Sequence, residues 1–134
     1  MHHYEQLELW KRGIALSGRL HRAARAARGN WSDRALWDQI SRAATSIPAN
    51  VAEGALRGSD REFARFLSIS MGSAAELHSL IDIAAVGGVL DPTEARTLIA
   101  EVIALRRMAS ALRARANGNR PRTQSSPLLA EDPT

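Results

Sequence analysis

Hydrophobic residues recur every three or four positions along four long segments of the chain, the period of a helix with one buried face. None of the segments shows the two-residue alternation of a half-buried strand. Long helices joined by short loops pack antiparallel with their neighbours. The sequence therefore predicts an all-α protein, an antiparallel up-down four-helix bundle over residues 1–116, with helices at about residues 5–28, 33–56, 60–86 and 92–116.

Short joints with capping residues separate the predicted helices. Ser59 and Glu62 form a Ser-x-x-Glu capping box before the third helix, and Asp91 followed by Pro92 opens the fourth. Ser32 is placed to cap the second helix. These side chains can bind the amides that a helix start leaves unpaired, so three helix starts are predicted from local sequence.

Three residues are unusual inside helices. Pro48 removes an amide from the second helix and should kink it or begin a new one. Ser70 and Ser73 lie within or beside the apolar stripe of the third helix, where we expect each hydroxyl to bond to a carbonyl one turn earlier.

The composition fits one compact domain and excludes several classes of protein. The chain has 134 residues, 45% apolar and 24% charged, and it has no cysteine for a disulfide, a thiol nucleophile or a Cys-ligated metal. Its apolar runs are far shorter than the roughly 20 residues that cross a bilayer, and its first residues lack the apolar region of a secretory signal. We expect a cytoplasmic protein with no membrane partner. Prolines among polar residues predict a disordered tail over residues 117–134.

The first predicted helix is apolar on two sides. One face holds Leu7, Trp10 and Ile14, and the other is made of Leu9, Leu16, Leu20, Ala23 and Ala27. Because a helix that is apolar on two sides is usually covered on both, one face is available to a second subunit. We assign Leu9, Leu16 and Leu20 to an oligomer interface.

The third predicted helix presents a line of small residues opposite its core stripe: Ala64, Ser68, Gly72, Ala75 and Ser79. Such spacing lets two helices approach closely, a rule best documented in membranes. We place Ser68, Gly72 and Ala75 in the same oligomer interface. The alternative is that small residues simply occupy solvent positions.

A polar stripe runs along the second predicted helix, formed by Arg42, Ser46, Asn50, Glu53 and Arg57 together with Gln39. These residues fall within about 80° of one another on the helix surface. The stripe is either a binding surface or a polar network that fixes helix register or a subunit contact, and the sequence favours the network.

The motif Ser46-Ile-Pro-Ala-Asn-Val-Ala-Glu-Gly54 resembles the signature of the bacterial four-helix bundle protein family, which includes proteins encoded by intervening sequences in large-subunit ribosomal RNA genes. The match extends back to Arg42, with Val51 where the family has isoleucine, and Leu7-Glu-Leu-Trp10 matches its N-terminal leucine–tryptophan motif. A third block matches at Arg57, Ser59, Glu62-Phe63, Arg65-Phe66-Leu67, Gly72-Ser73 and Glu76-Leu77, and departs from the family at Ser70 and Met71.

The resemblance covers roughly residues 4–116 and implies a homopentamer of antiparallel bundles. It extends to the accessory protein of diversity-generating retroelements, a basic pentameric barrel that binds nucleic acid. It therefore implies RNA or DNA and a reverse transcriptase as partners. For most of the family no biochemical activity is established, so the implied function is coarse.

Positive charge is concentrated in the first predicted helix. The chain carries a net charge of +4, and this helix alone has six basic residues against Glu5 and Glu8. Repeated in every subunit of an oligomer, the surface would attract phosphates without reading bases. We assign nucleic-acid binding to Arg12, Arg19, Arg22, Arg25 and Arg28, and the alternative is an arginine-rich face that is only solvated.

Catalytic chemistry has little support in the sequence. His78 and Asp82 lie one helical turn apart, but two ligands do not make a metal site. Gly87-Gly88 follows a helix end and has the role of a C-cap rather than a phosphate loop. We expect a protein that is not an enzyme and uses no metal or cofactor. Two functions remain, a nucleic-acid-binding oligomer and a protein-interaction scaffold that does not bind nucleic acid.

Overall fold

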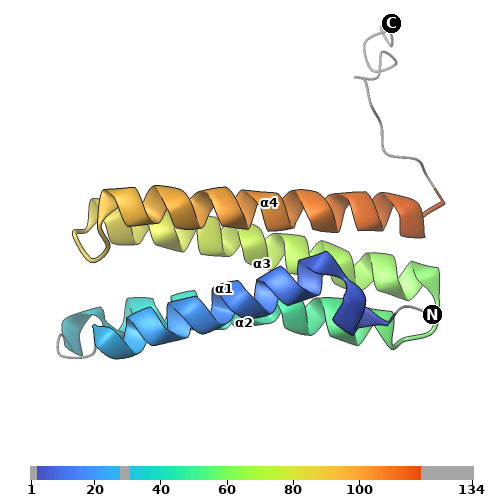
Figure 1. Ribbon diagram of the computed structural model, residues 1–134, viewed down its shortest axis with the longest axis horizontal. Coiled ribbons are helices and arrows are strands. Elements are labelled where there is room, and N and C mark those ends of the chain that lie inside the picture. Colours follow the sequence, from blue (N-terminus) through green and yellow to red (C-terminus); the bar gives the residue numbers. More distant parts are fainter. Residues whose placement is uncertain (1–2, 28–30, 119–134) are drawn as a thin grey trace, which may run out of the picture.

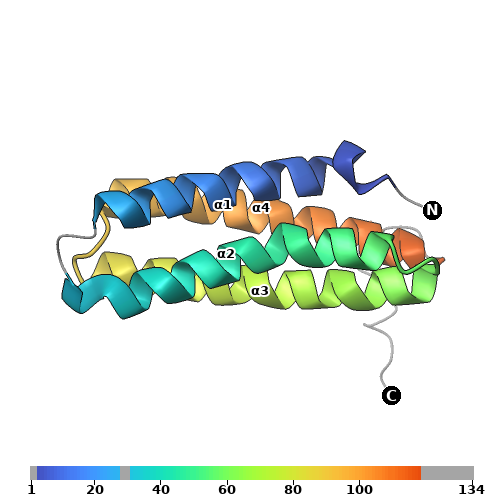
Figure 2. The same ribbon diagram turned by 90° about the horizontal axis from the view of Figure 1, so that it is seen from below.

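The computed structural model describes residues 3–27 and 31–118, which form four long helices (Figures 1 and 2). Successive helices run antiparallel, and α1 also lies beside α4, so the helices close into a bundle. The predicted all-α bundle is confirmed, and the part of the predicted tail from residue 119 onward lies outside the described residues. The helices are α1, Glu8–Ala26; α2, Arg34–Ala55; α3, Asp60–Val86; and α4, Pro92–Ala116, with 3₁₀ turns at Tyr4–Gln6 and Trp31–Asp33.

Side-chain caps begin α3 and α4. The Ser59 hydroxyl accepts a hydrogen bond from the amide of Glu62 at 3.1 Å. The Asp91 carboxylate accepts from the amides of Thr93 and Glu94 at 3.0 and 3.2 Å. Both predicted caps are confirmed. The second half of the capping box does not form, because the Glu62 carboxylate pairs with Arg65 at 3.2 Å.

The start of α2 differs from the prediction. A 3₁₀ turn, Trp31–Asp33, leads directly into the helix, so the residue before it is Asp33 and not Ser32. Asp33 has φ −96° and ψ 0° and makes no capping hydrogen bond, because an N-cap normally needs an extended backbone. Pro48 does not begin a new helix, since α2 continues through it to Ala55.

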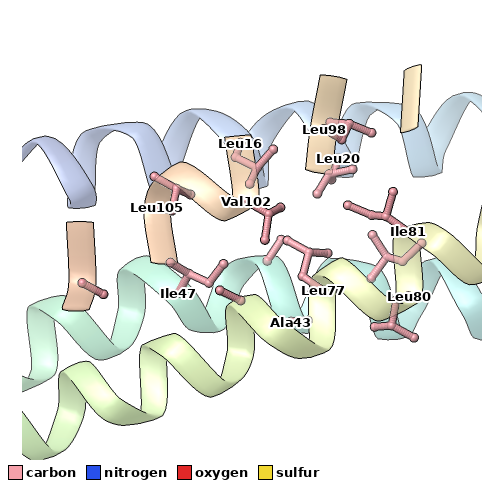
Figure 3. Packing of buried hydrophobic residues seen from close by; sticks show 14 of the residues in the cluster. Leu16, Leu20, Ala43, Ile47, Leu77, Leu80, Ile81, Leu98, Val102 and Leu105 are labelled. Atoms are coloured by element: carbon pink, nitrogen blue, oxygen red, sulfur yellow. The ribbon is translucent and has the colours of Figure 1, made fainter. Parts of the chain in front are cut away.

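The core is filled by aliphatic side chains from all four helices (Figure 3). Leu9, Leu16 and Leu20 of α1 belong to it and are only 1%, 4% and 1% exposed. Their assignment to an oligomer interface is therefore wrong. Both apolar faces of α1 have helical periodicity, so the pattern alone could not show which face turns inward. On the opposite face Ile14 is 46% exposed, whereas Leu7 and Trp10 are partly buried against the core.

The helices α2 and α3 are in close contact where Gly54 meets Phe66. A Cβ atom added to Gly54 would lie 2.6 Å from the Cβ of Phe66 and 3.3 Å from the ring of Phe63. Side chains cannot occupy such short distances, so this position admits only glycine unless the helices separate.

Replacing Gly54 with alanine should lower the free energy of unfolding by about 1–3 kcal/mol, the usual cost of overpacking a core. Chemical denaturation measures this. The control is Gly18→Ala in α1, where a Cβ would meet only a guanidinium nitrogen of Arg22 at 3.7 Å. Alanine favours a helix over glycine by about 1 kcal/mol, so the control should be as stable as the wild type or more so. Equal stability of both variants would show that α2 and α3 do not need this close approach.

Candidate nucleic-acid interface

Two of the five predicted binding arginines form ion pairs between α1 and α4. The Arg12 Nε and Nη2 atoms donate to the two carboxylate oxygens of Glu101 at 2.9 and 2.6 Å. Arg19 donates to Glu94 at 2.8 Å. Each guanidinium is neutralised locally by its carboxylate, which makes Arg12 and Arg19 weak candidates for phosphate contacts.

The Arg12–Glu101 pair shifts the pKa of both groups. The hydrogen bonds from Arg12 hold the pKa of Glu101 below its usual value, although partial burial opposes this. The same hydrogen bonds raise the pKa of Arg12. Charge pairing between α1 and α4 therefore depends on an ionised Glu101.

The remaining arginines of α1 are free for other contacts. Arg22 and Arg25 are exposed, and neither forms an ion pair with a described residue. Arg28, the fifth predicted binding residue, lies outside the described residues. The usable charge of the first helix is thus at its C-terminal end.

A hollow of about 580 Å³ opens between this end of α1 and the first half of α2. Its volume lies within the range of about 300–1,000 Å³ that is typical of small-molecule sites. The two helix ends that form it lie at the same end of the bundle, on the left in Figure 1. The lining residues are His21, Ala24, Arg25, Ala27, Arg34, Trp37, Asp38, Ser41 and Arg42.

Three arginines surround this hollow, Arg25 from α1 and Arg34 and Arg42 from α2. All three are exposed, and within the described part of the chain none of them is ion-paired. In the sequence, Arg25 belongs to the basic first helix and Arg42 to the polar stripe of the second. Antiparallel packing of α1 on α2 brings them together. Sequence reasoning missed Arg34, although its spacing of two helical turns from Arg42 puts both on one face.

Ser46 and Asn50 of the polar stripe are used for packing between α2 and α3. The Ser46 and Ser73 hydroxyls are hydrogen-bonded at 2.7 Å, and the Asn50 amide donates to both the carbonyl and the hydroxyl of Ser46 at 2.8 Å. Ser70 donates to the carbonyl of Ile47 at 3.0 Å. Ser70 and Ser73 thus bond across to α2 and not back along their own helix, because the two helices lie close enough for a short hydroxyl side chain to reach.

Glu53 and Arg57 form the C-terminal end of the stripe, next to the loop between α2 and α3. The two residues pair at 2.8 Å. The Arg57 guanidinium lies 4.9 Å from the centre of the Phe66 ring, and that of Arg65 lies 4.6 Å from the same ring. Of the five stripe residues, Arg42 is the one that faces the hollow.

The small-residue line of α3 is open to solvent. Ser68, Gly72 and Ala75 are exposed, and a Cβ added to Gly72 would meet nothing within 4 Å. Ile69 and Ile83 on the same helix are 40% and 55% exposed. Within the single chain Ser68 accepts a hydrogen bond from Arg113 of α4 at 3.0 Å, whereas Gly72 has open space beside it. The place of this surface in an oligomer interface stays a prediction.

The described residues contain no group of three or more His, Asp or Glu side chains that could hold a metal ion. His78 and Asp82 lie 3.5 Å apart as an isolated pair on α3. Among the helices that the structure describes, none is both long enough and apolar enough to cross a membrane.

Comparison with known proteins agrees with this fold and with the motifs. The chain matches the family described as 23S rRNA-intervening sequence protein over residues 5–111. It belongs to that family. A solved structure from Bacteroides thetaiotaomicron, a protein of unknown function from the S23 ribosomal protein family, superposes with a TM-score of 0.71 at 16% identity. The match covers 75% of this chain and 94% of the other, and at that identity it shows the fold alone. No curated protein matches.

Replacing Glu101 with glutamine should reduce the free energy of unfolding near neutral pH by about 0.5–1 kcal/mol, the typical value of a partly exposed pair. Because the folded-state pKa of Glu101 is lowered, its contribution is present above the unfolded pKa of about 4.3 and is lost as pH falls through the folded pKa. The difference between wild type and variant should therefore close in acid. Denaturant titrations from neutral to acid pH measure it, with Glu76→Gln, at an exposed site on α3, as control. A difference that is independent of pH would contradict this assignment.

Proposed function

We propose that this protein is a non-enzymatic, homo-oligomeric bundle that binds nucleic acid through the hollow between α1 and α2. One observation carries the proposal. Arg25, Arg34 and Arg42 gather around one hollow without ion pairs among the described residues, whereas Arg12 and Arg19 are neutralised by α4. Unpaired guanidinium groups in a cluster bind phosphate oxygens well, because each presents several donors in a planar fork.

Phosphate contacts of this kind give affinity that depends on salt and carries little sequence information. Oligomerisation would repeat the hollow on every subunit, and simultaneous contacts raise the overall affinity. The family name refers to intervening sequences of 23S rRNA, so structured RNA is the first ligand to test and duplex DNA the second. A reverse transcriptase is the protein partner that the resemblance to retroelement accessory proteins implies.

The oligomer that we propose is a pentamer, as the resemblance implies, assembled through the exposed face of α3. Ser68, Gly72 and Ala75 offer a surface without bulky side chains, and Ile69 and Ile83 flank it with apolar area. Burial of these isoleucines against another subunit would supply about 25 cal/mol for each Å² removed from water. The outer residue Ile14 of α1 replaces the buried leucines as the candidate contact on that helix.

The same apolar face favours a second candidate function, a scaffold that displays protein-binding surfaces without binding nucleic acid. Val86 at the end of α3 is 91% exposed and Ile83 is 55% exposed, and a partner protein could cover both. The two functions differ in one property, the affinity for RNA and DNA.

The double variant Arg25→Glu with Arg34→Glu should bind RNA at least about tenfold more weakly, because it removes phosphate contacts and repels the backbone. Fluorescence anisotropy with a labelled structured RNA and a labelled DNA duplex, each at several salt concentrations, measures this. Arg106→Glu with Arg107→Glu on α4 makes the same change in net charge at exposed positions away from the hollow. If both double variants lost RNA affinity equally, the loss would be explained by net charge and not by the hollow. If the wild-type protein bound neither RNA nor DNA at low salt, the scaffold would be the remaining candidate function.

Gly72→Leu should break the oligomer and leave each bundle folded, because a side chain at this position is unobstructed within the single chain. Native mass spectrometry gives the subunit number, and circular dichroism reports the helices. Ser110→Leu adds the same bulk to an exposed position on α4 and should not change the mass. An unaltered assembly in Gly72→Leu would remove this face from the interface, and a monomeric wild type would end the oligomer proposal.

A further inference from the structure

We propose that the hollow between α1 and α2 accepts an unpaired nucleotide, so that this protein prefers nucleic acid with exposed bases over a fully paired duplex. The inference rests on the proposed function and adds the class of nucleic acid that the site selects. It is supported by a set of residues in the hollow that would not contact a phosphate backbone.

Asp38 is the first of these residues. It lies one helical turn from Arg34 on one side and one turn from Arg42 on the other, and all three line the hollow. Such spacing permits ion pairs, yet Asp38 forms none with any described residue. A carboxylate weakens a site for phosphate alone, but it is a good acceptor for the amino group of a base.

His21 gives the hollow a fixed aromatic face. Its Nδ1 atom donates to the carbonyl of Ser17 at 2.8 Å, and this bond orients the ring at the rim of the hollow. Unstacked bases are bound in many complexes by stacking on histidine rings and arginine planes. Arg25 is the neighbouring guanidinium on the same helix end.

The floor of the hollow is apolar, with Ala24, Ala27 and Trp37. The Trp37 side chain is only 5% exposed, and its indole Nε1 is buried with no hydrogen-bond partner among the described residues. That donor has almost no accessible surface, so a ligand in the hollow would meet the apolar part of the ring and not the indole N–H. A base presents an apolar face to such a lining.

A nucleotide is the ligand that uses all of these groups together. Its phosphate suits Arg25, Arg34 and Arg42, its base suits the ring of His21 and the apolar floor, and its amino group suits Asp38. Inorganic phosphate or an acidic peptide would use the arginines but would offer no amino group of a base to Asp38 and no base to stack on His21. Bases within a duplex are stacked and paired, so they cannot enter.

Two labelled RNA duplexes with the same number of phosphates test the inference, one with blunt ends and one with unpaired 3′ nucleotides. Stacking of one base corresponds to a factor of roughly 5 to 150 in affinity. We expect the wild-type protein to bind the overhang duplex at least about fivefold more tightly than the blunt one. The full chain is used in its native assembly at pH 8.5, where histidine side chains are ordinarily neutral.

His21→Ala and Asp38→Asn should each reduce this preference at least twofold, by different routes. Both positions are exposed, so the bundle should stay folded, which circular dichroism checks. His21→Ala leaves the charge unchanged and should not alter affinity for the blunt duplex. Asp38→Asn removes a negative charge and should bind the blunt duplex as tightly as wild type or more tightly. A purely electrostatic role of Asp38 would instead tighten both complexes equally.

Equal affinity of wild type for the two duplexes, with binding that weakens as salt rises, would overturn this inference and leave the proposed function intact. A preference for the overhang that survives in both variants would also overturn it, because the unpaired base would then bind elsewhere. Failure to bind either RNA or a DNA duplex at low salt would overturn the proposed function itself. A preference that falls in both variants while blunt-duplex affinity is kept supports the inference.

Discussion

The close approach of α2 to α3 is the constraint on which the rest of the bundle depends. Gly54 leaves room for Phe66, and the hydroxyls of Ser46 and Ser73 meet between the same two helices. Contacts this close fix how far the two helices are shifted along, and rotated about, their axes relative to each other. On the same side of α2, Ser46 meets α3, and Arg42, one turn earlier, lines the hollow beside α1. The signature motif thus contributes to the packing of α2 on α3.

The elements of this fold were predictable because their signals are local. Helical periodicity and the caps Ser59 and Asp91 each involve residues a few positions apart, and the structure confirms both caps. The inward face of α1 was not predictable in this way. Its two apolar faces are equivalent in periodicity, and the choice of the face with Leu16 depends on how well it fits side chains from three other helices. At the start of α2 a 3₁₀ turn makes Asp33, and not Ser32, the residue that precedes the helix.

The candidate site was predicted only in part, since sequence shows where charges are but not how they pair. Arg12 and Arg19 lie 89 and 75 positions from their carboxylate partners, separations at which no helical spacing rule applies. Arg25 and Arg42 come from different helices and meet only when α1 and α2 pack antiparallel. The basic helix and the polar stripe each contributed part of one site, and Arg34 completes it without having been predicted.

Pairing also explains why net charge is a poor guide to where this protein would bind phosphates. The whole chain carries +4, but Arg12, Arg19, Arg57 and Arg65 each lie against a glutamate. An exposed ion pair has almost no field beyond a Debye length of about 8 Å at physiological salt. Among the described residues that line the hollow, three are arginines and one is the acidic Asp38, so the hollow itself keeps an excess of positive charge. A phosphate backbone is attracted by that local excess, and the sum over the chain matters only at longer range.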